Sequence, residues 1–380
     1  PVTGATNGVY PRHSLRTWQQ QDPDGFNICI QAWQGVMNVT ETDPYSWYEI
    51  AGIHGAPFKS WGEPNPRDPP EIGYCSHASG LFPTWHRIYV ALLEQRLLVH
   101  AQRIASRFTG PDSRRYRDAG ERCRISYWDW SETDVLPSVI TTPRITVTTP
   151  DGPNEIANPL YSYRFYSDRF TEDFTGPFAR IPNTARQPDR NSGVSRHDRV
   201  QAALSAGFRA RRQNTYNVFS VDNFNAATNR AFRSNSTPGN LVSIESIHDE
   251  VHNAVGGQYG HMSYLEYSGF DPIFWLHHSN VDRIIAMYQA VHPGRGVEPQ
   301  AATMNFANPM PSPGEEEDDL TPLRPFYDRT GRFYTSRDMI SASSIFDFGY
   351  SYPEIPVHFR GRPDEELQAF TRSRVNALYG

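Results

Sequence analysis

The sequence predicts a mainly α-helical protein, in which a central bundle of helices is wrapped by long loops and a few short β-strands. Two observations support this prediction. A few segments repeat apolar residues every three or four positions, the spacing of one helical face, and these segments carry histidines. Elsewhere, 31 prolines and 27 glycines interrupt regular structure. Because no low-complexity linker or repeat divides the chain, we expect a single domain over residues 1–380.

The first expected helix covers residues 28–37, and a short helical turn at 48–53 precedes His54. From residue 82 to about residue 108, apolar side chains recur at helical spacing and predict one long amphipathic helix. These elements place the first histidines of the chain on or beside helices.

Two more helices are expected in the second half of the chain. One runs from about 241 to 255 and ends at the Gly256-Gly257 pair, which is a good C-terminal stop. The other begins at Asp271-Pro272, with Asp as N-cap and Pro at the first helical position, and continues to about residue 292.

The remaining segments are expected to be irregular. Residues 141–196 contain one likely strand at 145–149 and are otherwise read as loop. The C-terminal third offers a few more short strands, such as residues 355–359. The acidic run at 315–319 is interpreted as a solvated loop rather than an interaction tail, because it lies inside the chain between turn signals.

Composition excludes some classes of partner. The net charge is -6 and no basic stripe is present, which argues against nucleic acid and anionic membrane. No apolar run reaches the length of a membrane span. The 49 Trp, Tyr and Phe residues (8, 20 and 21) can still build a sizeable core.

Several features are typical of a secreted protein. The chain opens at Pro1 without an apolar leader, as a processed N-terminus does, and Asn38 and Asn235 lie in glycosylation sequons. Three cysteines, Cys29, Cys75 and Cys123, leave one without a disulfide partner.

Six of the 13 histidines form two groups of three. His248 and His252 are four apart, so both imidazoles lie on one helical face, and the pair His277-His278 follows them. The earlier group is His54, His77 and His86. Three imidazoles without a thiolate or carboxylate suit copper, zinc, iron or nickel and leave a coordination position open.

Each part of this histidine pattern, taken alone, also has an ordinary structural explanation. A His-x-x-x-His pair is common on helices, and an isolated His54 is more often an ordinary half-buried residue. Zinc peptidases place Glu directly after the first His of such a pair, but here Asp249 stands there and Glu250 is turned away by about 100° of helix. The pattern therefore disfavours a peptidase.

The whole pattern resembles the tyrosinases and catechol oxidases, the polyphenol oxidase family. Residues 74–77 (YCSH) with 82–87 (FPTWHR) resemble its first copper-binding signature, and residues 271–278 (DPIFWLHH) with 280–283 (NVDR) resemble the second. Residues 350–352 (YSY) are similar to the Tyr-x-Tyr motif that closes the catalytic domain of fungal members. The resemblance covers roughly residues 10–355.

The resemblance implies a type-3 copper protein, whose antiparallel four-helix bundle holds two copper ions. The first copper would be bound by His54, His77 and His86, and the second by His248, His252 and His278. His277 would lie beside the site.

The resemblance also accounts for the odd cysteine. In similar fungal members, the Cys two residues before the second histidine ligand forms a thioether with it, and Cys75 and His77 match this spacing. Cys29 and Cys123 would then form a disulfide, consistent with secretion. The alternative is that Cys75 is a free thiol.

The implied activity is oxidation of catechol-like o-diphenols to o-quinones, with O2 as cosubstrate reduced to water. Phe274 lies four residues before His278 and would support the docked aromatic substrate, and Asn253 would lie at the substrate mouth. Asp282, four residues after His278, either orients a ligand or forms an ion pair with an arginine such as Arg283 or Arg87.

The residue after the first ligand of the second copper bears on substrate range. In hydroxylating members a Glu at the position of Glu245, with an Asn at that of Asp249, holds a water that deprotonates a monophenol. An ionised Asp accepts hydrogen bonds and donates none, so strong monophenol hydroxylation is disfavoured. Catechol oxidase with weak hydroxylation of small phenols is the favoured interpretation. Full tyrosinase is the alternative, and a hemocyanin-like O2 carrier is a remote one.

Some questions stay open at the level of sequence. Longer fungal members carry a C-terminal lid domain, and this chain ends 28 residues after Tyr352, either because a lid was removed or because none was present. The physiological phenol, the oligomeric state and glycan occupancy are not predicted.

Overall fold

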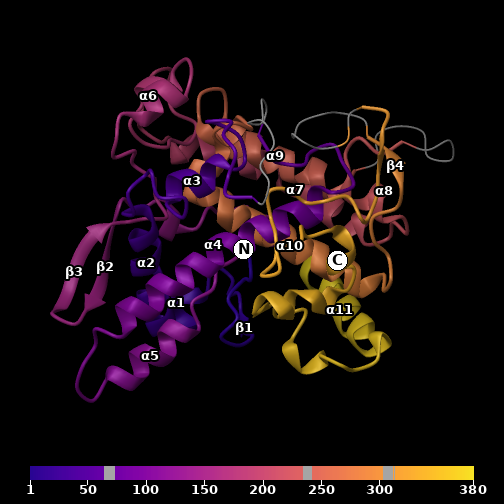
Figure 1. The fold of residues 1–380 in the computed structure, drawn as a ribbon, viewed down its shortest axis with the longest axis horizontal. Helices are drawn as coiled ribbons and strands as arrows, with labels where there is room; N and C mark the ends of the chain where they lie inside the picture. The colour runs from indigo at the N-terminus through magenta and orange to yellow at the C-terminus, as the bar shows by residue number, and fades with distance from the viewer. Residues whose placement is uncertain (64–72, 234–241, 303–310, 312) are drawn as a thin grey trace.

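Two long helices, α4 (Phe82–Ala105) and α10 (Pro272–Val291), pack against each other at the centre of the molecule (Figure 1). Helix α2 (Pro23–Met37) packs on α4, and α9 (Ile244–Gly256) packs on α10. The computed structural model describes residues 1–63, 73–233, 242–302, 311 and 313–380. The prediction of a mainly helical protein with a central bundle is confirmed.

Helix α10 is buried along its whole length, which is how a helix with apolar residues on all sides is accommodated. As predicted, the Asp271 side chain caps it, accepting a hydrogen bond from the Ile273 backbone at 3.0 Å, and Pro272 follows at the first helical position. Helix α2 begins five residues earlier than expected, because Asp22 caps it in the same manner at Gly25.

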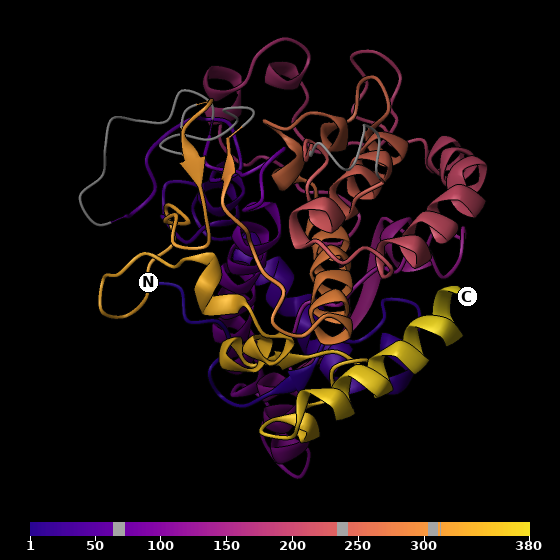
Figure 2. The same cartoon turned by 90° about the vertical axis from the view of Figure 1, so that its right-hand side faces the viewer.

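The central helices are surrounded by shorter or more peripheral ones. These are α1 (Trp18–Gln21), α3 (Trp47–Gly52), α5 (Ser113–Glu121), α6 (Arg169–Asp173), α7 (His197–Val218), α8 (Phe224–Thr228) and α11 (Asp364–Tyr379). Helix α11 lies on the outside of the molecule, where it packs on α10 and α7 (Figure 2).

Helices α5, α7 and α11 were not predicted. The buried face of α7 consists of Val200, Leu204, Arg211, Thr215 and Val218, so polar residues occupy two positions of the helical repeat. The Arg211 side chain is satisfied there by carbonyl oxygens of Trp130 and Leu204 and by Glu250. A search for apolar periodicity alone misses such a face.

Strands are short in the described part of the chain and form pairs. β1 (Tyr10–Pro11) pairs in parallel with β6 (Tyr350–Ser351); the antiparallel pairs are β2 (Arg144–Thr149) with β3 (Gly152–Ala157), and β4 (Gln300–Ala301) with β5 (Glu316–Glu317). The β2–β3 hairpin projects from the left of Figure 1.

Three expectations for irregular segments were wrong. Within 141–196, residues 152–157 form strand β3 and residues 169–173 form helix α6 rather than loop. Residues 355–359 do not form a strand, because Pro356 lacks an N–H donor and Val357–Phe359 turn into a 3-10 helix. The acidic run is not fully solvated, since Glu317 is buried and accepts hydrogen bonds from Ser79 and Gly80.

A buried ion cluster around Asp282 joins α10, α4 and both ends of the fold. The Asp282 carboxylate forms ion pairs with Arg87 and Arg12, and it accepts hydrogen bonds from the hydroxyls of Tyr350 at 2.6 Å and Tyr352 at 2.8 Å. The Arg12 guanidinium also lies 3.5 Å from the Tyr350 ring centroid. Asp282 is therefore a structural ion-pair residue with Arg87, and the Tyr-x-Tyr motif serves this cluster.

The predicted disulfide between Cys29 and Cys123 is confirmed and ties α2 to the segment that follows α5. Cys75 is a buried free thiol in this structure. One hydrophobic cluster contains residues from Val2 to Tyr379, and it includes the inner faces of the four central helices.

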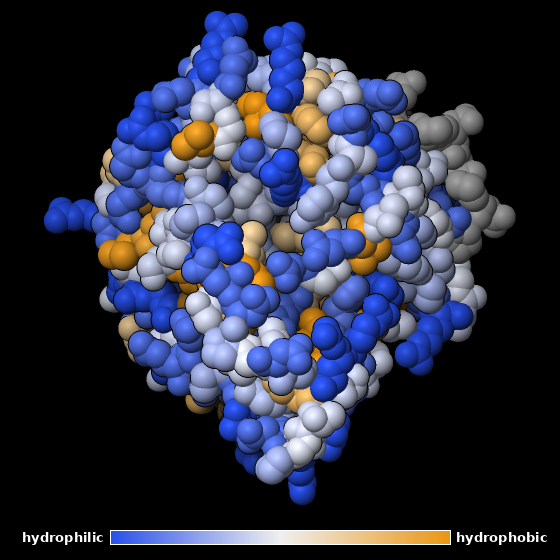
Figure 3. Space-filling view, turned by 90° about the vertical axis from the view of Figure 1, so that its left-hand side faces the viewer, coloured by the Kyte–Doolittle hydropathy of each residue, from blue (hydrophilic) through white to orange (hydrophobic). Residues whose placement is uncertain are grey.

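On the face that carries the β2–β3 hairpin, hydrophobic residues form only small separate spots (Figure 3). Among the described residues, no helix combines the length and the apolar character that crossing a bilayer requires.

Candidate metal centre

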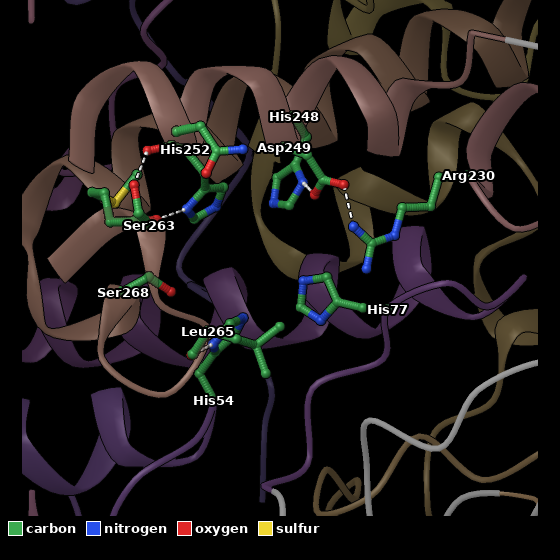
Figure 4. Close-up of a pocket in the computed structure, with 11 residues that line it drawn as sticks. His54, His77, Arg230, His248, Asp249, His252, Ser263, Leu265 and Ser268 are labelled. Atoms are coloured by element: carbon green, nitrogen blue, oxygen red, sulfur yellow. Dashed lines mark hydrogen bonds and ion pairs between the residues drawn. The ribbon is translucent and has the colours of Figure 1, made fainter. Parts of the chain in front are cut away.

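Six buried histidines converge on one region between the central helices. Helix α9 supplies His248 and His252, and α10 supplies His278; His86 lies in the first turns of α4, and His77 and His54 lie in the loops before α4 and after α3. In the close-up, His248 and His252 project from α9 toward His54 and His77 on the opposite side (Figure 4). The structure thus brings together all six predicted ligands.

The Nε2 atoms lie at the spacing expected for shared metal ions. His278 Nε2 is 3.2 Å from His248 Nε2 and 3.3 Å from His252 Nε2, and His54 Nε2 is 3.4 Å from His86 Nε2. Two imidazoles bound at about 2.0–2.1 Å to one tetrahedral ion place their nitrogens about 3.3–3.4 Å apart. The rings of His86 and His278 stack with centroids 4.5 Å apart, so the two groups adjoin.

Hydrogen bonds at Nδ1, the second ring nitrogen, hold four of the six imidazoles in these orientations. Four of the six rings direct Nδ1 at a backbone or carboxylate oxygen: His54 at Leu265 O (2.8 Å), His86 at Phe82 O (2.8 Å), His252 at Met262 O (2.7 Å) and His248 at Asp249 Oδ1 (3.0 Å). A ring that donates from Nδ1 keeps the lone pair on Nε2, which is then available to a metal.

Burial favours the neutral form of five of the six imidazoles. It lowers the pKa of His54 to about 3, and it holds the pKa values of His77, His86, His252 and His278 well below 6.5. Since a histidine must be deprotonated to bind a metal, these rings are ready to ligate at neutral pH. Imidazole nitrogens with no carboxylate in either group suit copper, zinc, iron or nickel, and copper is the metal that the family resemblance implies.

His277 adjoins the second group, with one nitrogen each of His248, His252, His277 and His278 within 4.8 Å of one another, and a neighbour defines its tautomer. The Trp130 indole donates a hydrogen bond to His277 Nδ1 at 2.9 Å. Because an indole N–H can only donate, Nδ1 carries the lone pair and the proton of the neutral ring is on Nε2. The ring stacks on His248 with centroids 5.0 Å apart. Trp130 was not singled out from the sequence.

The thiol of Cys75 lies close to two of the rings. Its Sγ and one nitrogen each of His54 and His77 are all within 4.8 Å of one another. Burial raises the pKa of this thiol. His77 Nδ1 is buried without a hydrogen-bond partner among the described residues. The thioether stays a prediction.

A cavity of about 180 Å³ opens beside the histidines, comparable to one that holds a single benzene ring, about 150 Å³. Its lining includes the apolar side chains of Met262 and Leu265, and Asn253 is exposed at its edge, where the sequence placed it. Phe274 does not line this cavity. Its ring lies 4.1 Å from that of His278, in line with the predicted packing of a ring on its ligand.

An arginine that the sequence did not reveal organises the acidic residues of the site. The Arg230 guanidinium forms an ion pair with Asp249 (Figure 4), and the Arg230 backbone N–H donates to Glu245 at 2.9 Å. Burial and the nearby Asp249 raise the pKa of Glu245 to about 8. Burial opposes ionisation of Asp249, but the hydrogen bond from His248 and the charge of Arg230 outweigh it and lower its pKa.

Glu245 and Asp249 therefore differ in their relation to the cavity. Asp249 and Arg230 line it, whereas Glu245 is fully buried and is not part of its wall. Arg230 precedes Glu245 by 15 residues and Asp249 by 19 residues. It lies in the connection after α8, which carries no motif, so no sequence signal identifies it.

Comparison with known proteins agrees with this geometry. A family profile described as the common central domain of tyrosinase matches residues 44–291. A tyrosinase of Podospora anserina is 36% identical over 396 residues, covering 100% of this chain and 68% of the relative. Polyphenol oxidase 4 of Agaricus bisporus is 33% identical over 395 residues, covering 100% of this chain and 61% of the relative.

A solved structure of latent and active mushroom tyrosinase superposes with a TM-score of 0.87 at 30% identity, covering 100% of this chain and 98% of that chain. The chain thus spans about two thirds of the length of these curated relatives.

Proposed function

The chain belongs to the tyrosinase family, and from this premise we propose that it is a copper oxidase that converts o-diphenols to o-quinones with O2 as cosubstrate. The observation that carries the proposal is the convergence of six buried imidazoles, in which the Nε2 atoms of His54 and His86 are 3.4 Å apart and those of His248 and His252 lie 3.2 and 3.3 Å from His278 Nε2. His54, His77 and His86 would hold one copper, and His248, His252 and His278 the other. Such a copper pair supplies the two-electron exchange between the diphenol and O2.

The surroundings of the six histidines suit a small phenol. The cavity is wide enough for one aromatic ring, and Met262 and Leu265 provide apolar contact while Asn253 offers a polar group at the edge. Phe274 does not line the cavity; its ring packs against those of His54 and His278, with centroids 4.9 and 4.1 Å apart, so it would influence a substrate only by positioning these two histidines.

The contacts of Asp249 and Glu245 support a preference for diphenols over monophenols. One oxygen of Asp249 contacts His248 and the other contacts Arg230. Both oxygens of Glu245 accept backbone N–H groups, from Ala78 at 2.6 Å and from Arg230 at 2.9 Å. Because all four carboxyl oxygens of Asp249 and Glu245 already contact protein groups, a water held between the two side chains to deprotonate a monophenol is disfavoured.

Oxygen consumption tests this proposal. With copper-loaded protein, we expect rapid uptake with catechol and slow uptake with phenol or tyrosine. Rapid oxidation of tyrosine without a catechol primer would favour the full tyrosinase alternative. Reversible O2 binding without catechol turnover, in protein that has not been activated, would indicate a carrier of the hemocyanin type.

Secretion and processing are part of the same proposal. The disulfide and the exposed side chain of Asn38, at the end of α2, are compatible with an extracellular, glycosylated protein. Asn235 lies outside the described residues. We expect the protein in the culture medium of its source, with a mass decrease on glycosidase treatment. Removal of two hydrogens from the polypeptide, beyond those of the disulfide, would show the thioether between Cys75 and His77.

A further inference from the structure

The loop that carries His77 is held between two buried acidic side chains that are distant in sequence. On one side, the backbone N–H of Ala78 donates to Glu245 Oε1 at 2.6 Å. On the other side, Glu317 from β5 accepts hydrogen bonds from Ser79 Oγ and from the Gly80 backbone N–H, both at 2.8 Å. Three consecutive residues after His77 are therefore fixed by two carboxyl groups.

Glu317 is in an unusual position for an acidic residue. It is 3% exposed, and in the part of the chain that the structure describes no Lys, Arg or His forms an ion pair with it. Its third hydrogen-bond donor is the Gln300 side chain at 2.6 Å, which is also neutral. Burying a carboxylate with only neutral donors is costly unless its hydrogen bonds are satisfied, and here each one ends on the His77 loop or on β4.

Apart from its proposed thioether to Cys75, His77 depends on such anchors more than the other five candidate ligands do. Four of those five lie on helices, and the fifth, His54, has its Nδ1 bound to the Leu265 carbonyl. His77 lies in a loop and its Nδ1 has no hydrogen-bond partner among the described residues. The next residue, Ala78, has φ +51°, a conformation uncommon outside glycine that the surroundings must hold.

We propose that Glu317 is a positioning residue for the first copper: by fixing Ser79 and Gly80 it keeps His77 facing His54 and His86. The inference rests on the proposed function for the identity of the metal. It gives a role to the one member of the acidic run that is buried beside the site, and it concerns a residue that touches neither substrate nor metal.

Three variants distinguish the effect of the Glu317 charge, the effect of its hydrogen bonds and a nonspecific effect of substitution in β5. Glu317→Ala removes both acceptor oxygens, whereas Glu317→Gln keeps an acceptor for the Gly80 N–H and removes the charge. Glu316→Gln is the matched control, since Glu316 is the exposed neighbour in the same strand. Each protein is loaded with two equivalents of Cu²⁺ and challenged with a chelator, while copper per chain and the EPR signal of isolated Cu²⁺ are followed.

We expect Glu317→Ala to lose one of its two coppers at least about tenfold faster than wild type, because residues that orient metal ligands typically change affinity by about 10–100-fold. The remaining ion would give the EPR signal of a single Cu²⁺ site. Glu317→Gln should fall between wild type and Glu317→Ala, and Glu316→Gln should match wild type. If Glu317→Ala does not fold, Glu317→Gln carries the test.

Two results would overturn the inference while leaving the proposed function intact. One is wild-type copper retention in both Glu317 variants. The other is equally fast loss of both ions, which would show general destabilisation rather than positioning of His77. A wild-type protein that binds fewer than two coppers would instead overturn the proposed function, and with it the inference.

Discussion

Removal of the Asp282 carboxylate should cost about 3–5 kcal/mol of unfolding free energy, the usual cost of breaking a buried ion pair from one side. Asp282 is 2% exposed and Arg87 is fully buried. Arg12 would keep Glu94 as a partner at 2.9 Å, but the other side-chain contact of Arg87 is the Ser344 hydroxyl at 3.4 Å. Asp282→Ala therefore leaves the Arg87 charge buried without compensation, between the helices that carry His86 and His278.

The contribution of Asp282 to the unfolding free energy should also depend on pH. Burial opposes ionisation of Asp282, but Arg87, Arg12 and the Tyr350 hydroxyl outweigh it and lower its pKa below 3.8. A carboxyl whose folded-state pKa is lowered stabilises the fold above its unfolded pKa, about 3.9, and loses this contribution as the pH falls through the folded-state value. The difference between wild type and Asp282→Asn should thus be constant from pH 7 to about pH 5 and shrink below about pH 4.

Urea unfolding of the metal-free protein, followed by circular dichroism, measures both effects. Asp347→Asn is the matched control, since Asp347 forms an exposed ion pair with Arg360 at 3.4 Å, and such pairs contribute about 0–1 kcal/mol. A loss of unfolding free energy below about 1 kcal/mol for Asp282→Ala, or one no larger than that of the control, would refute the assignment of Asp282 as a structural ion-pair residue.

Three further predictions follow from the contacts of other residues. Arg230→Gln should raise the ratio of tyrosine to catechol oxidation severalfold, because it frees the Asp249 oxygen that the Arg230 guanidinium contacts. An unchanged ratio in oxygen-uptake assays would contradict a role of Arg230 in substrate preference. Replacing Cys29 and Cys123 with Ser should lower the unfolding free energy measured with urea by about 4.7 kcal/mol, since the disulfide joins residues 94 positions apart; a reduced wild type that is as stable as the oxidised protein would count against it. Trp130→Phe should cost about 1–3 kcal/mol by leaving His277 Nδ1 without its donor, while copper stays at two per chain; loss of a copper would show that the hydrogen bond also supports the metal site.

The extent to which sequence predicted this molecule differs between its parts for physical reasons. The six histidines were predictable because helical spacing and two long signatures place them, and the structure brings them together. The cap of α10 was predictable because Asp271 and Pro272 act locally.

The contacts that Arg230 and Glu317 make with distant segments were not predictable. Arg230 reaches Asp249 and Glu245 from a connection without a motif. Glu317 belongs to an acidic run whose composition indicates a solvated loop, and only tertiary contacts with Ser79 and Gly80 bury it. In each case, an ion pair or hydrogen bond between distant segments outweighs the local preference of the sequence.

Metal analysis of the purified wild type and of two histidine variants tests the central claim most directly. We predict two coppers per chain in the wild type and in His277→Ala, and one copper with no catechol oxidation in His278→Ala. One ion per chain in active wild-type protein, zinc in place of copper, or full activity in His278→Ala would contradict the assignment of the two metal centres.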